Sequence, residues 1–392
     1  NYMVGMNGVD APFKWSGTGE TSVLANAPAT GRYPVLYNEK LFCVPGDNLS
    51  QIWWSESFAP ENWPAINYWG VKDGDGDEIK CLKVFQGDLI IFKSRSTHML
   101  RGTSMQDFRL DEMDAQIGCV GHLAAAQLAN RLYFVSPEGL YYFNGLGNVS
   151  ISANSIPVLW NDIDQNNLDK ACVGTWDDLV WFSLPLQRTL NLKITAACSV
   201  DGSITIELGG VSKTISLTAN DDTANKVADK IRALTFDGWT LSGSTDTIIF
   251  TRNRLKPPLE LTLSTGTTGV NGTITKPAQK TNNFVIIYDP INGAAFWPNL
   301  GINASGFQAF DDGNQVKFYS GDSLNGYVNQ QDVGTEDFGN PVSAYWIGKS
   351  FDVALASHFK KAKRAYIEDS PDQDIAADFK ASLDYGDFLE WQ

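Results

Sequence analysis

The stretch LYNEKLFCV, residues 36–44, contains a pattern that returns along the chain. A short polar turn, Asn-Glu-Lys, stands before an apolar segment with the composition of a β-strand. The same arrangement recurs downstream, in VFQGDLIIF (84–92), QLANRLYFV (127–135), TWDDLVWFS (175–183) and, with a longer turn, AFDDGNQVKFYS (309–320). The chain is therefore predicted to repeat one strand-based unit.

The spacing of these copies exposes an insertion. The first apolar residues after the turns serve as anchors, and they are Leu41, Leu89, Leu132, Leu179 and Val316. Successive anchors are 48, 43, 47 and 137 residues apart. Residues 188–281 differ in composition from their surroundings, and without these 94 residues the last separation falls to 43. We therefore expect three parts: residues 1–187, an inserted domain at 188–281, and residues 282–392.

A second β-like segment follows each anchor strand after about ten residues. These segments are SQIWWSE, STHMLRG, EGLYYFNG, NFVIIYDPINGAAFW and LNGYVNQ. Two hairpins in a unit of about 40 to 50 residues have the dimensions of a four-stranded propeller blade. With YMVGMNGVDAPFKWSG near the start, and FKKAKRAYIEDS and DFKASLDYGDF near the end, the sequence predicts a mainly β fold, a β-propeller of about six blades.

The insertion carries the clearest helical period. In TANKVADKIRAL (223–234), Val227, Ile231 and Leu234 fall on one face, after a start rich in Thr, Asn and Asp. Strands are expected at ITIELGG, VSKTISLT, WTLSG, DTIIFTRN and LELTLSTG, before a Gly/Thr-rich tail, TGTTGVNGT. The insertion is thus predicted to be a small α+β domain.

The aromatic stretch IWWSESFAPENWPAINYW (52–69) allows two interpretations. Trp53, Trp54, Trp63 and Trp69 could form a stacking platform for a sugar or a base, or they could pack in the interior. Neighbouring residues of a strand point to opposite faces, so Trp53 and Trp54 cannot both line one open site. Packing between blades is the favoured interpretation.

Composition excludes several classes of function. The chain has 45 acidic and 30 basic residues, a formal net charge of −15, and no Lys/Arg-rich segment, which argues against a surface that grips phosphates. Five widely spaced cysteines, Cys43, Cys81, Cys119, Cys172 and Cys198, are expected to be buried free thiols. No apolar run reaches the roughly 18 residues of a membrane span, and no signal peptide is expected.

Candidate chemistry is sparse. The three histidines, His98, His122 and His358, are far apart in sequence, and neither a nucleophile elbow nor a phosphate-binding loop is present. The segment DGDGDE (73–78) places Asp73, Asp75 and Asp77 at alternate positions, as at the start of a calcium loop, but Val84 stands where the bidentate Glu belongs. We predict no catalytic, cofactor-binding or metal-binding residues, no cofactor and no enzymatic activity.

Several phrases resemble the propeller hub and nozzle proteins of bacteriophage tails. They are NGVDAPFKWSGTG (7–19), NEKLFCVPGDNLSQIWWSESFAPENWP and KVFQGDLIIFKSRSTHML. Within the insertion, Asp222, Thr223, Ala224, Val227, Ala228 and Ile231 match the helix phrase of small α+β modules that recur in phage tail proteins.

The resemblance covers residues 7 to about 330 and implies a virion structural protein. It implies a homo-oligomeric ring, commonly a hexamer, at the connector, nozzle or hub of the tail, with other tail and connector proteins as partners. The genome would pass through its lumen during ejection without specific contacts, and the protein would be assembled in the host cytoplasm, with no membrane insertion. The alternative is a receptor- or carbohydrate-binding propeller, or a glycoside-hydrolysing one, at the tail tip.

Overall fold

The computed structural model describes residues 2–153, 156–255, 258–291 and 295–331, together with four two-residue strands. The latter are β30 (Glu336–Asp337), β31 (Asn340–Pro341), β32 (Lys380–Ala381) and β33 (Leu389–Glu390). The chain divides into two compact units, Asn1–Val333 and Gly334–Gln392. The predicted strands in FKKAKRAYIEDS, and most of those in DFKASLDYGDF, lie outside the described residues.

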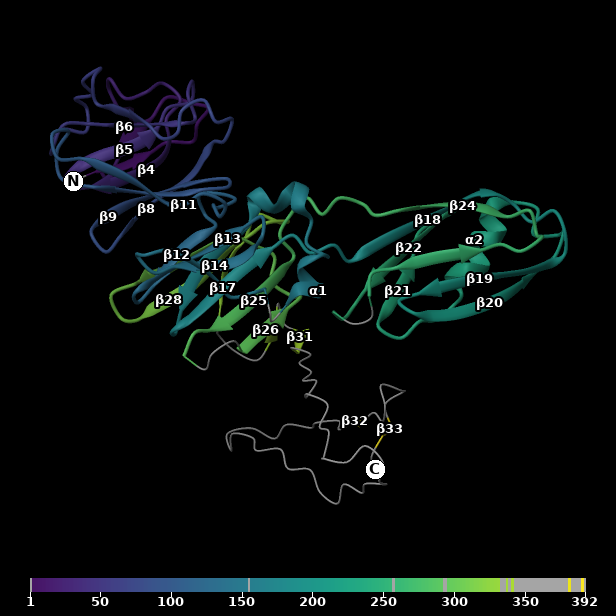
Figure 1. Ribbon diagram of the computed structural model, residues 1–392. Coiled ribbons are helices and arrows are strands. Elements are labelled where there is room, and N and C mark those ends of the chain that lie inside the picture. The colour runs from purple at the N-terminus through teal and green to yellow at the C-terminus, as the bar shows by residue number, and fades with distance from the viewer. Residues whose placement is uncertain are drawn as a thin grey trace, which may run out of the picture. The chain divides into compact units, whose positions relative to one another are not determined.

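The fold is mainly β, as predicted, and antiparallel sheets follow one another along the chain (Figure 1). The first sheet has three strands, β1 (Met3–Gly5), β2 (Phe13–Trp15) and β3 (Ser22–Val23). The second has four, β4 (Arg32–Tyr37), β5 (Lys40–Val44), β6 (Gln51–Trp54) and β7 (Tyr68–Gly70). The third contains β8 (Ile79–Phe85), β9 (Asp88–Lys93), β10 (Thr97–Arg101) and β11 (Arg109–Asp114).

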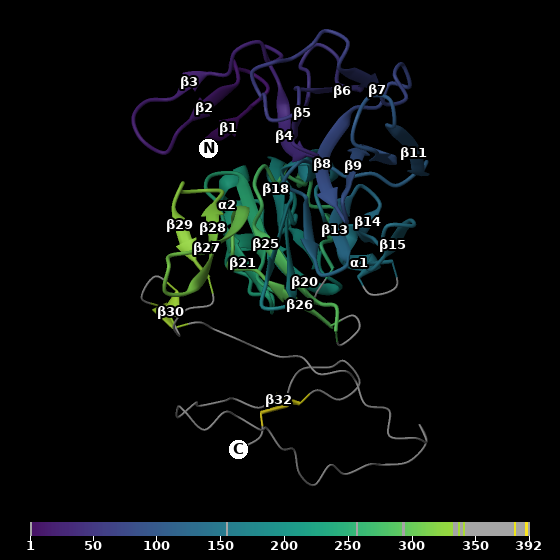
Figure 2. The ribbon, with the colours of Figure 1, turned by 90° about the vertical axis from the view of Figure 1, so that its left-hand side faces the viewer.

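Three further sheets complete this series among the described residues up to 331. The fourth contains β12 (Ala125–Leu128), β13 (Arg131–Ser136), β14 (Gly139–Phe143) and β15 (Asn148–Ser150). The fifth pairs β16 (Cys172–Trp176) and β17 (Leu179–Leu184) with β25 (Phe284–Asp289) and β26 (Ala295–Asn299). The sixth contains β27 (Ala304–Asp311), β28 (Val316–Asp322) and β29 (Val328–Gln330), side by side in Figure 2.

Each anchor residue lies in the second strand of a sheet. Leu41, Leu89, Leu132, Leu179 and Val316 belong to β5, β9, β13, β17 and β28. The polar turns before them close tight hairpins, and Asn38, Glu39, Asp177 and Asp178 have positive φ, from 45° to 64°. Two-residue turns with this left-handed backbone match the twist of antiparallel strands, which explains the polar residues there.

Successive sheets contact one another through their first strands. Strand β4 lies against β8, β12 contacts both β8 and β16, and β16 lies against β27. Strand β9 is buried on both faces: Leu89 and Ile91 pack toward the β4–β7 sheet, and Ile90 and Phe92 toward the β12–β15 sheet. The alternating directions of side chains along a strand produce this division. The continuous apolar runs of the repeats are therefore strands enclosed between two neighbours.

Residues 189–275 form two sheets and a helix with a separate hydrophobic cluster. One sheet contains β18 (Thr189–Ala196), β21 (Trp239–Ser242), β22 (Thr247–Arg252) and β24 (Asn271–Thr275). The other contains β19 (Gly202–Leu208), β20 (Val211–Leu217) and β23 (Leu261–Ser264). Strands β18 and β24 were not predicted: the sequence indicated no strand at the first and only a tail at the second.

Helix α2 (Ala224–Arg232) matches the predicted amphipathic segment. The Thr223 side chain caps it by accepting a hydrogen bond from the Lys226 backbone N–H at 3.3 Å. Val227 and Ile231 are fully buried in the cluster, whereas Leu234 lies beyond the helix and is partly buried. The helix packs on β18, β20 and β22 (Figure 1) and closes the core of residues 189–275.

Polar contacts hold the two ends of this segment beside the fifth sheet. The Asn283 side chain accepts from the Leu186 N–H at 2.8 Å and donates to the Leu186 carbonyl at 3.0 Å. Asp162 forms an ion pair of 2.8 Å with Arg252, whose side chain is 1% exposed. Asp162 follows the short helix α1 (Pro157–Trp160) and precedes a 3-10 turn, Gln165–Lys170. The chain thus leaves and re-enters the fifth sheet at neighbouring points.

Candidate functional site

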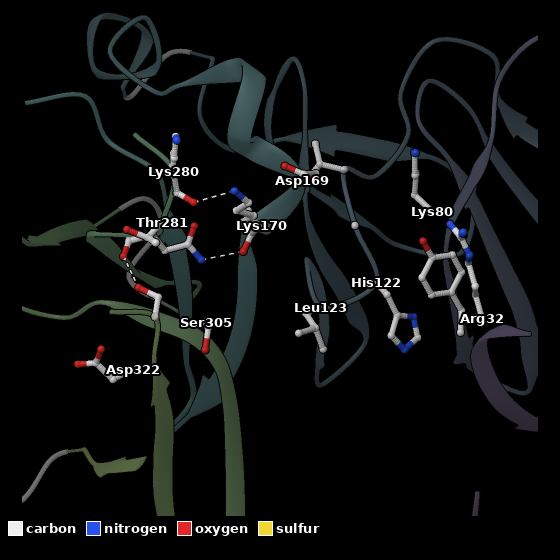
Figure 3. Close-up of a pocket in the computed structure, with 16 residues that line it drawn as sticks. Arg32, Lys80, His122, Leu123, Asp169, Lys170, Lys280, Thr281, Ser305 and Asp322 are labelled. Carbon is white, nitrogen blue, oxygen red and sulfur yellow. Dashed lines mark hydrogen bonds between the residues drawn. The ribbon is translucent and has the colours of Figure 1, made fainter. Parts of the chain in front are cut away.

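A pocket of about 740 Å³ lies where the first strands of several sheets begin. Seven segments supply its lining, namely 32–33, 80, 120–123, 169–171, 280–282, 305 and 322–323. Its volume falls within the range of about 300–1,000 Å³ that is typical of sites for small molecules. In Figure 3, Arg32, Lys80 and His122 lie at one end, and Lys280, Thr281 and Asp322 at the other.

A distorted strand carries Arg32 and Tyr33 into the pocket. The pairing register of β4 and β5 shifts between Arg32 and Val35, and Tyr33 adopts a left-handed backbone with φ of 57°. Pro34 follows and has no N–H to contribute, which is tolerated because β4 is an edge strand of its sheet. Left-handed backbone at a bulky residue costs about 1–3 kcal/mol and is concentrated at functional sites.

The guanidinium of Arg32 lies at this end of the pocket and forms no ion pair with a described residue. Its Nε is shielded from solvent and has no hydrogen-bond partner among the described residues. A methyl group at Gly8 would meet this side chain at 2.4 Å, so the glycine, with φ of 77°, allows the arginine stem to lie close to the backbone. The strand fixes where Arg32 lies and leaves its donors available.

The imidazole of His122 stacks on the ring of Tyr33. The ring centroids are 5.0 Å apart and the planes differ by 21°. His122 Nδ1 is buried and has no hydrogen-bond partner among the described residues. The two thiols beside this loop donate hydrogen bonds to backbone carbonyl oxygens. Cys81 Sγ lies 3.6 Å from the His122 oxygen, and Cys119 Sγ lies 3.3 Å from the Gly121 oxygen.

The opposite wall is a hydrogen-bonded network around Asn282. Its side-chain amide donates to the carbonyl oxygens of Lys170, at 2.7 Å, and Ala304, at 2.8 Å. Both amide hydrogens are thereby used, and the buried Oδ1 has no hydrogen-bond partner among the described residues. Lys170 Nζ donates to the Lys280 carbonyl at 2.8 Å, which ties together the segments that precede β16 and β25.

The pocket reverses the charge balance of the chain. Its lining includes four basic side chains, Arg32, Lys80, Lys170 and Lys280, and two acidic ones, Asp169 and Asp322, although the whole chain carries a net charge of −15. Backbone N–H groups of Asn325 and Leu324 hydrogen-bond to the Asp322 carboxylate and hold its pKa below the ordinary value. This arrangement suits an anion more than a cation.

The tryptophans of residues 52–69 pack on hydrophobic clusters, as the favoured interpretation predicted: Trp54 and Trp63 are buried, and Trp53 and Trp69 are partly buried. Trp54 is 1% exposed and packs between the β4–β7 and β8–β11 sheets. Trp53 lies on the opposite face with Trp63 and stacks on Tyr68 at 5.7 Å. Trp69 packs on the same cluster as Trp54. The four rings do not form one open platform.

The acidic segment 73–78 is an ordered loop whose three carboxylates have different partners. Asp73 accepts from Asn48 and Gln51, and Asp77 accepts from the backbone N–H groups of Ser94 and Arg95. Asp75 forms a 2.6 Å ion pair with Lys93, which is fully buried. In the part of the chain that the structure describes, no group of three or more His, Cys, Asp or Glu side chains is placed to hold a metal ion.

The remaining candidates are the cysteines and the histidines, and of these His122 lines the pocket. All five cysteines are buried and unpaired, as predicted. His98 is buried beside Ser96, with Nε2 3.0 Å from the hydroxyl, and burial lowers its pKa. His122 reaches the pocket, and His358 lies outside the described residues. Sequence inspection missed Arg32, Tyr33 and Asn282; Pro34 after an aromatic residue within a strand was the available signal for the bulge.

Comparisons with known proteins give no family and no close relative. No protein-family profile matches the chain, and no curated protein matches it. Solved structures that match this chain include β-propeller-like domains. In the next sentence, the first percentage in each bracket is the share of this chain that is covered, and the second is the share of the other chain. The AfRom2 CNH domain is 8% identical (82% and 87%; TM-score 0.29), and the N-terminal domain of Nup159 is 6% identical (74% and 86%; TM-score 0.26).

A chain from Mycobacterium phage Patience also matches, at 14% identity over 65% of this chain and 84% of that chain, with a TM-score of 0.16. TM-scores of this size do not carry a function from these proteins to this one. No described helix has the length and apolar character to cross a membrane.

Proposed function

We propose that this protein is a non-enzymatic structural subunit of a bacteriophage tail. In this proposal the successive antiparallel sheets are blades of a β-propeller of about six blades, and residues 188–281 are an inserted α+β domain. The subunits assemble into a homo-oligomeric ring, a hexamer by resemblance, at the connector, nozzle or hub. Support comes from the phrases in residues 7–19 and 38–64 and from the sheet order, in which first strands adjoin one another.

One structural observation carries the proposal of assembly. The β27–β29 sheet exposes five apolar side chains at its two hairpin ends, namely Phe310, Val316, Leu324, Tyr327 and Val328, each at least 51% exposed. Phe310 and Val316 lie at one end of β28, and Leu324, Tyr327 and Val328 lie at the other. Burying these exposed side chains on association would remove apolar area from water. We call these five residues the β27–β29 apolar group. A subunit that contacts neighbours in a ring would bury such a group.

The proposed mechanism in genome ejection is passive. The chain carries a net charge of −15, and like charges repel over about a Debye length, roughly 8 Å at physiological salt. A ring lumen lined by this acidic protein would repel the DNA backbone and let it pass without sticking. The partners are other tail and connector proteins in the virion, and DNA is only a transient passenger. Assembly takes place in the cytoplasm of the bacterial host.

The test is the assembly state of the purified chain. Sedimentation velocity and negative-stain images should show a ring with an axial hole. The double variant Leu324→Ser/Tyr327→Ser should remain folded by circular dichroism but shift to monomers. Leu146→Ser is the matched control, because Leu146 is 85% exposed on the β14–β15 turn, outside the β27–β29 apolar group. A wild-type chain that stays monomeric at every concentration would overturn the proposal.

The second candidate is a receptor- or carbohydrate-binding propeller at the tail tip, which the polar pocket favours. Immunogold labelling of virions separates the two: label at the axis of the tail supports the ring, and label on a peripheral fibre or spike supports the receptor-binding function.

A further inference from the structure

The pocket described above is lined by four basic and two acidic side chains. We propose that it binds a small oxyanion, a carboxylate or a phosphate ester, whose charged group lies at Arg32. This proposal is separate from ring assembly, because no residue of the pocket belongs to the β27–β29 apolar group.

The guanidinium of Arg32 is the primary recognition group. It is held by a left-handed bulge at Tyr33 and by close contact with Gly8, but makes no ion pair with any described residue. Its Nε is shielded beside Gly8, whereas the two terminal amino groups are neither shielded nor hydrogen-bonded to a described residue, so they are the donors that a ligand in the pocket can reach. Guanidinium groups bind carboxylate and phosphate oxygens with two parallel hydrogen bonds.

His122 adds a second donor at the same end. Stacking on Tyr33 fixes the plane of the imidazole, and its carbonyl oxygen lies against Cys81 Sγ, so ring and backbone are both held. Nδ1 is shielded from solvent, whereas Nε2 is neither shielded nor hydrogen-bonded to a described residue, and in a tautomer that carries hydrogen there it can donate to an oxyanion in the pocket. Lys80 stands at the same end (Figure 3) but is already paired with Glu78 at 2.7 Å, so it adds positive potential more than a free donor.

The other end of the pocket is a fixed wall. Asn282 is 1% exposed, and both of its amide hydrogens are used, so its orientation is fixed. Its Oδ1 is shielded from solvent and therefore lies beyond the reach of a ligand in the pocket. The charged group at Arg32 alone thus decides which ligands bind.

The experiment is a calorimetric titration of the full chain with glucuronate, inorganic phosphate and glucose. We expect glucuronate to bind more tightly than glucose by at least about tenfold, since only the former carries the charge that Arg32 recognises. Binding should weaken as ionic strength rises. Phosphate that competes with glucuronate supports one shared oxyanion site, and binding of phosphate without glucuronate assigns that site to phosphate groups. If neither anion binds, or if glucose binds as well as glucuronate, the proposal is overturned.

Variants locate the site. Arg32→Met keeps most of the aliphatic stem and should weaken anion binding about tenfold or more, because a charge-assisted hydrogen-bonded pair is lost. His122→Phe keeps the stacking on Tyr33 and should give a smaller loss, which tests the site even if Arg32→Met does not fold. Arg109→Met is the matched control, since Arg109 is 74% exposed, pairs with Asp111 and lies outside the pocket lining. Wild-type affinity in both Arg32→Met and His122→Phe would also overturn the proposal.

Discussion

Side chains are buried differently in two sets of strands. One set belongs to the six sheets outside residues 189–275, which we call the repeated sheets, and the other belongs to residues 189–275. In β9, five consecutive residues from Leu89 to Lys93 are buried, because a sheet lies on each side. In β22, burial alternates strictly, with Ile248, Phe250 and Arg252 inside. The first pattern requires neighbouring sheets on both faces, whereas the second needs cover on one face, which α2 supplies. One region depends on its series, and the other completes its own core.

This difference predicts that the repeated sheets and residues 189–275 can be destabilised separately. The largest effect is expected from a substitution in the core that neighbouring repeated sheets share. Phe134 is fully buried and packs on Phe92, with ring centroids 4.7 Å apart. Phe134→Ala should lower the free energy of unfolding of the repeated sheets by about 3–5 kcal/mol, because a large cavity is created between two sheets. Hydrogen exchange followed by mass spectrometry should show lost protection in β8–β17 and unchanged protection in α2 and β18–β22.

The matched control is Phe250→Ala, which empties a fully buried site in the cluster of residues 189–275. It should produce the opposite map, with loss confined to that segment. Equal loss in both regions from either variant would show one cooperative unit and break the comparison.

A smaller effect is expected from the buried lysine of the repeated sheets. Lys93 Nζ contacts Asp75 and the Val71 carbonyl, at 2.6 and 2.9 Å. Asp75→Asn should cost about 1–3 kcal/mol, because a buried ammonium loses its carboxylate. Burial acts to raise the pKa of Asp75, but hydrogen bonds from Lys93 and the Asp77 N–H outweigh it, and the pKa is lowered.

The sign of the pH dependence follows. Because the folded state lowers this pKa, the stabilisation is fully present above the ordinary Asp value of about 3.9 and is lost as pH falls through the lowered pKa. Urea unfolding of wild type and Asp75→Asn should therefore converge in acid. Asp88→Asn is the control, since Asp88 forms only an exposed, 3.4 Å pair with Arg101. A constant difference between wild type and Asp75→Asn down to strong acid would show that the carboxylate charge is not involved.

Strands buried on both faces were easier to predict from the sequence than strands buried on one face or on neither. Continuous apolar runs such as DLIIF stand out, so the anchors, the hairpins and their polar turns were predictable. Strand β24, NGTIT, has no fully buried residue, which left no apolar signal to find. Strand β18 alternates between buried and exposed residues at the junction between regions, where its short period was overlooked. Packing of the four tryptophans was predictable because Trp53 and Trp54 are adjacent on one strand.

The pocket could not be predicted, for a different reason. Arg32 and Asn282 are 250 positions apart in the sequence, and they line one pocket only because first strands of separate sheets adjoin. Neither residue belongs to a motif. What marks them is an unpaired polar atom in a shielded place, and that property exists only in the folded chain.

The smallest effect provides the sharpest test of the comparison. Deleting residues 188–281 and joining the ends with a short Gly/Ser linker should leave the repeated sheets folded, with their free energy of unfolding changed by no more than about 1 kcal/mol. Strands β17 and β25 pair directly, from Leu184 with Phe284 to Val180 with Tyr288, so the deletion interrupts no ladder. Asp162 loses Arg252 and Lys276 but becomes open to solvent, which limits the cost of its unpaired charge.

Urea unfolding of the deletion variant measures the change directly. The variant should also assemble poorly if the segment contributes contacts between subunits. A deletion product that does not fold would mean that residues 189–275 support the sheets, despite a hydrophobic cluster of their own.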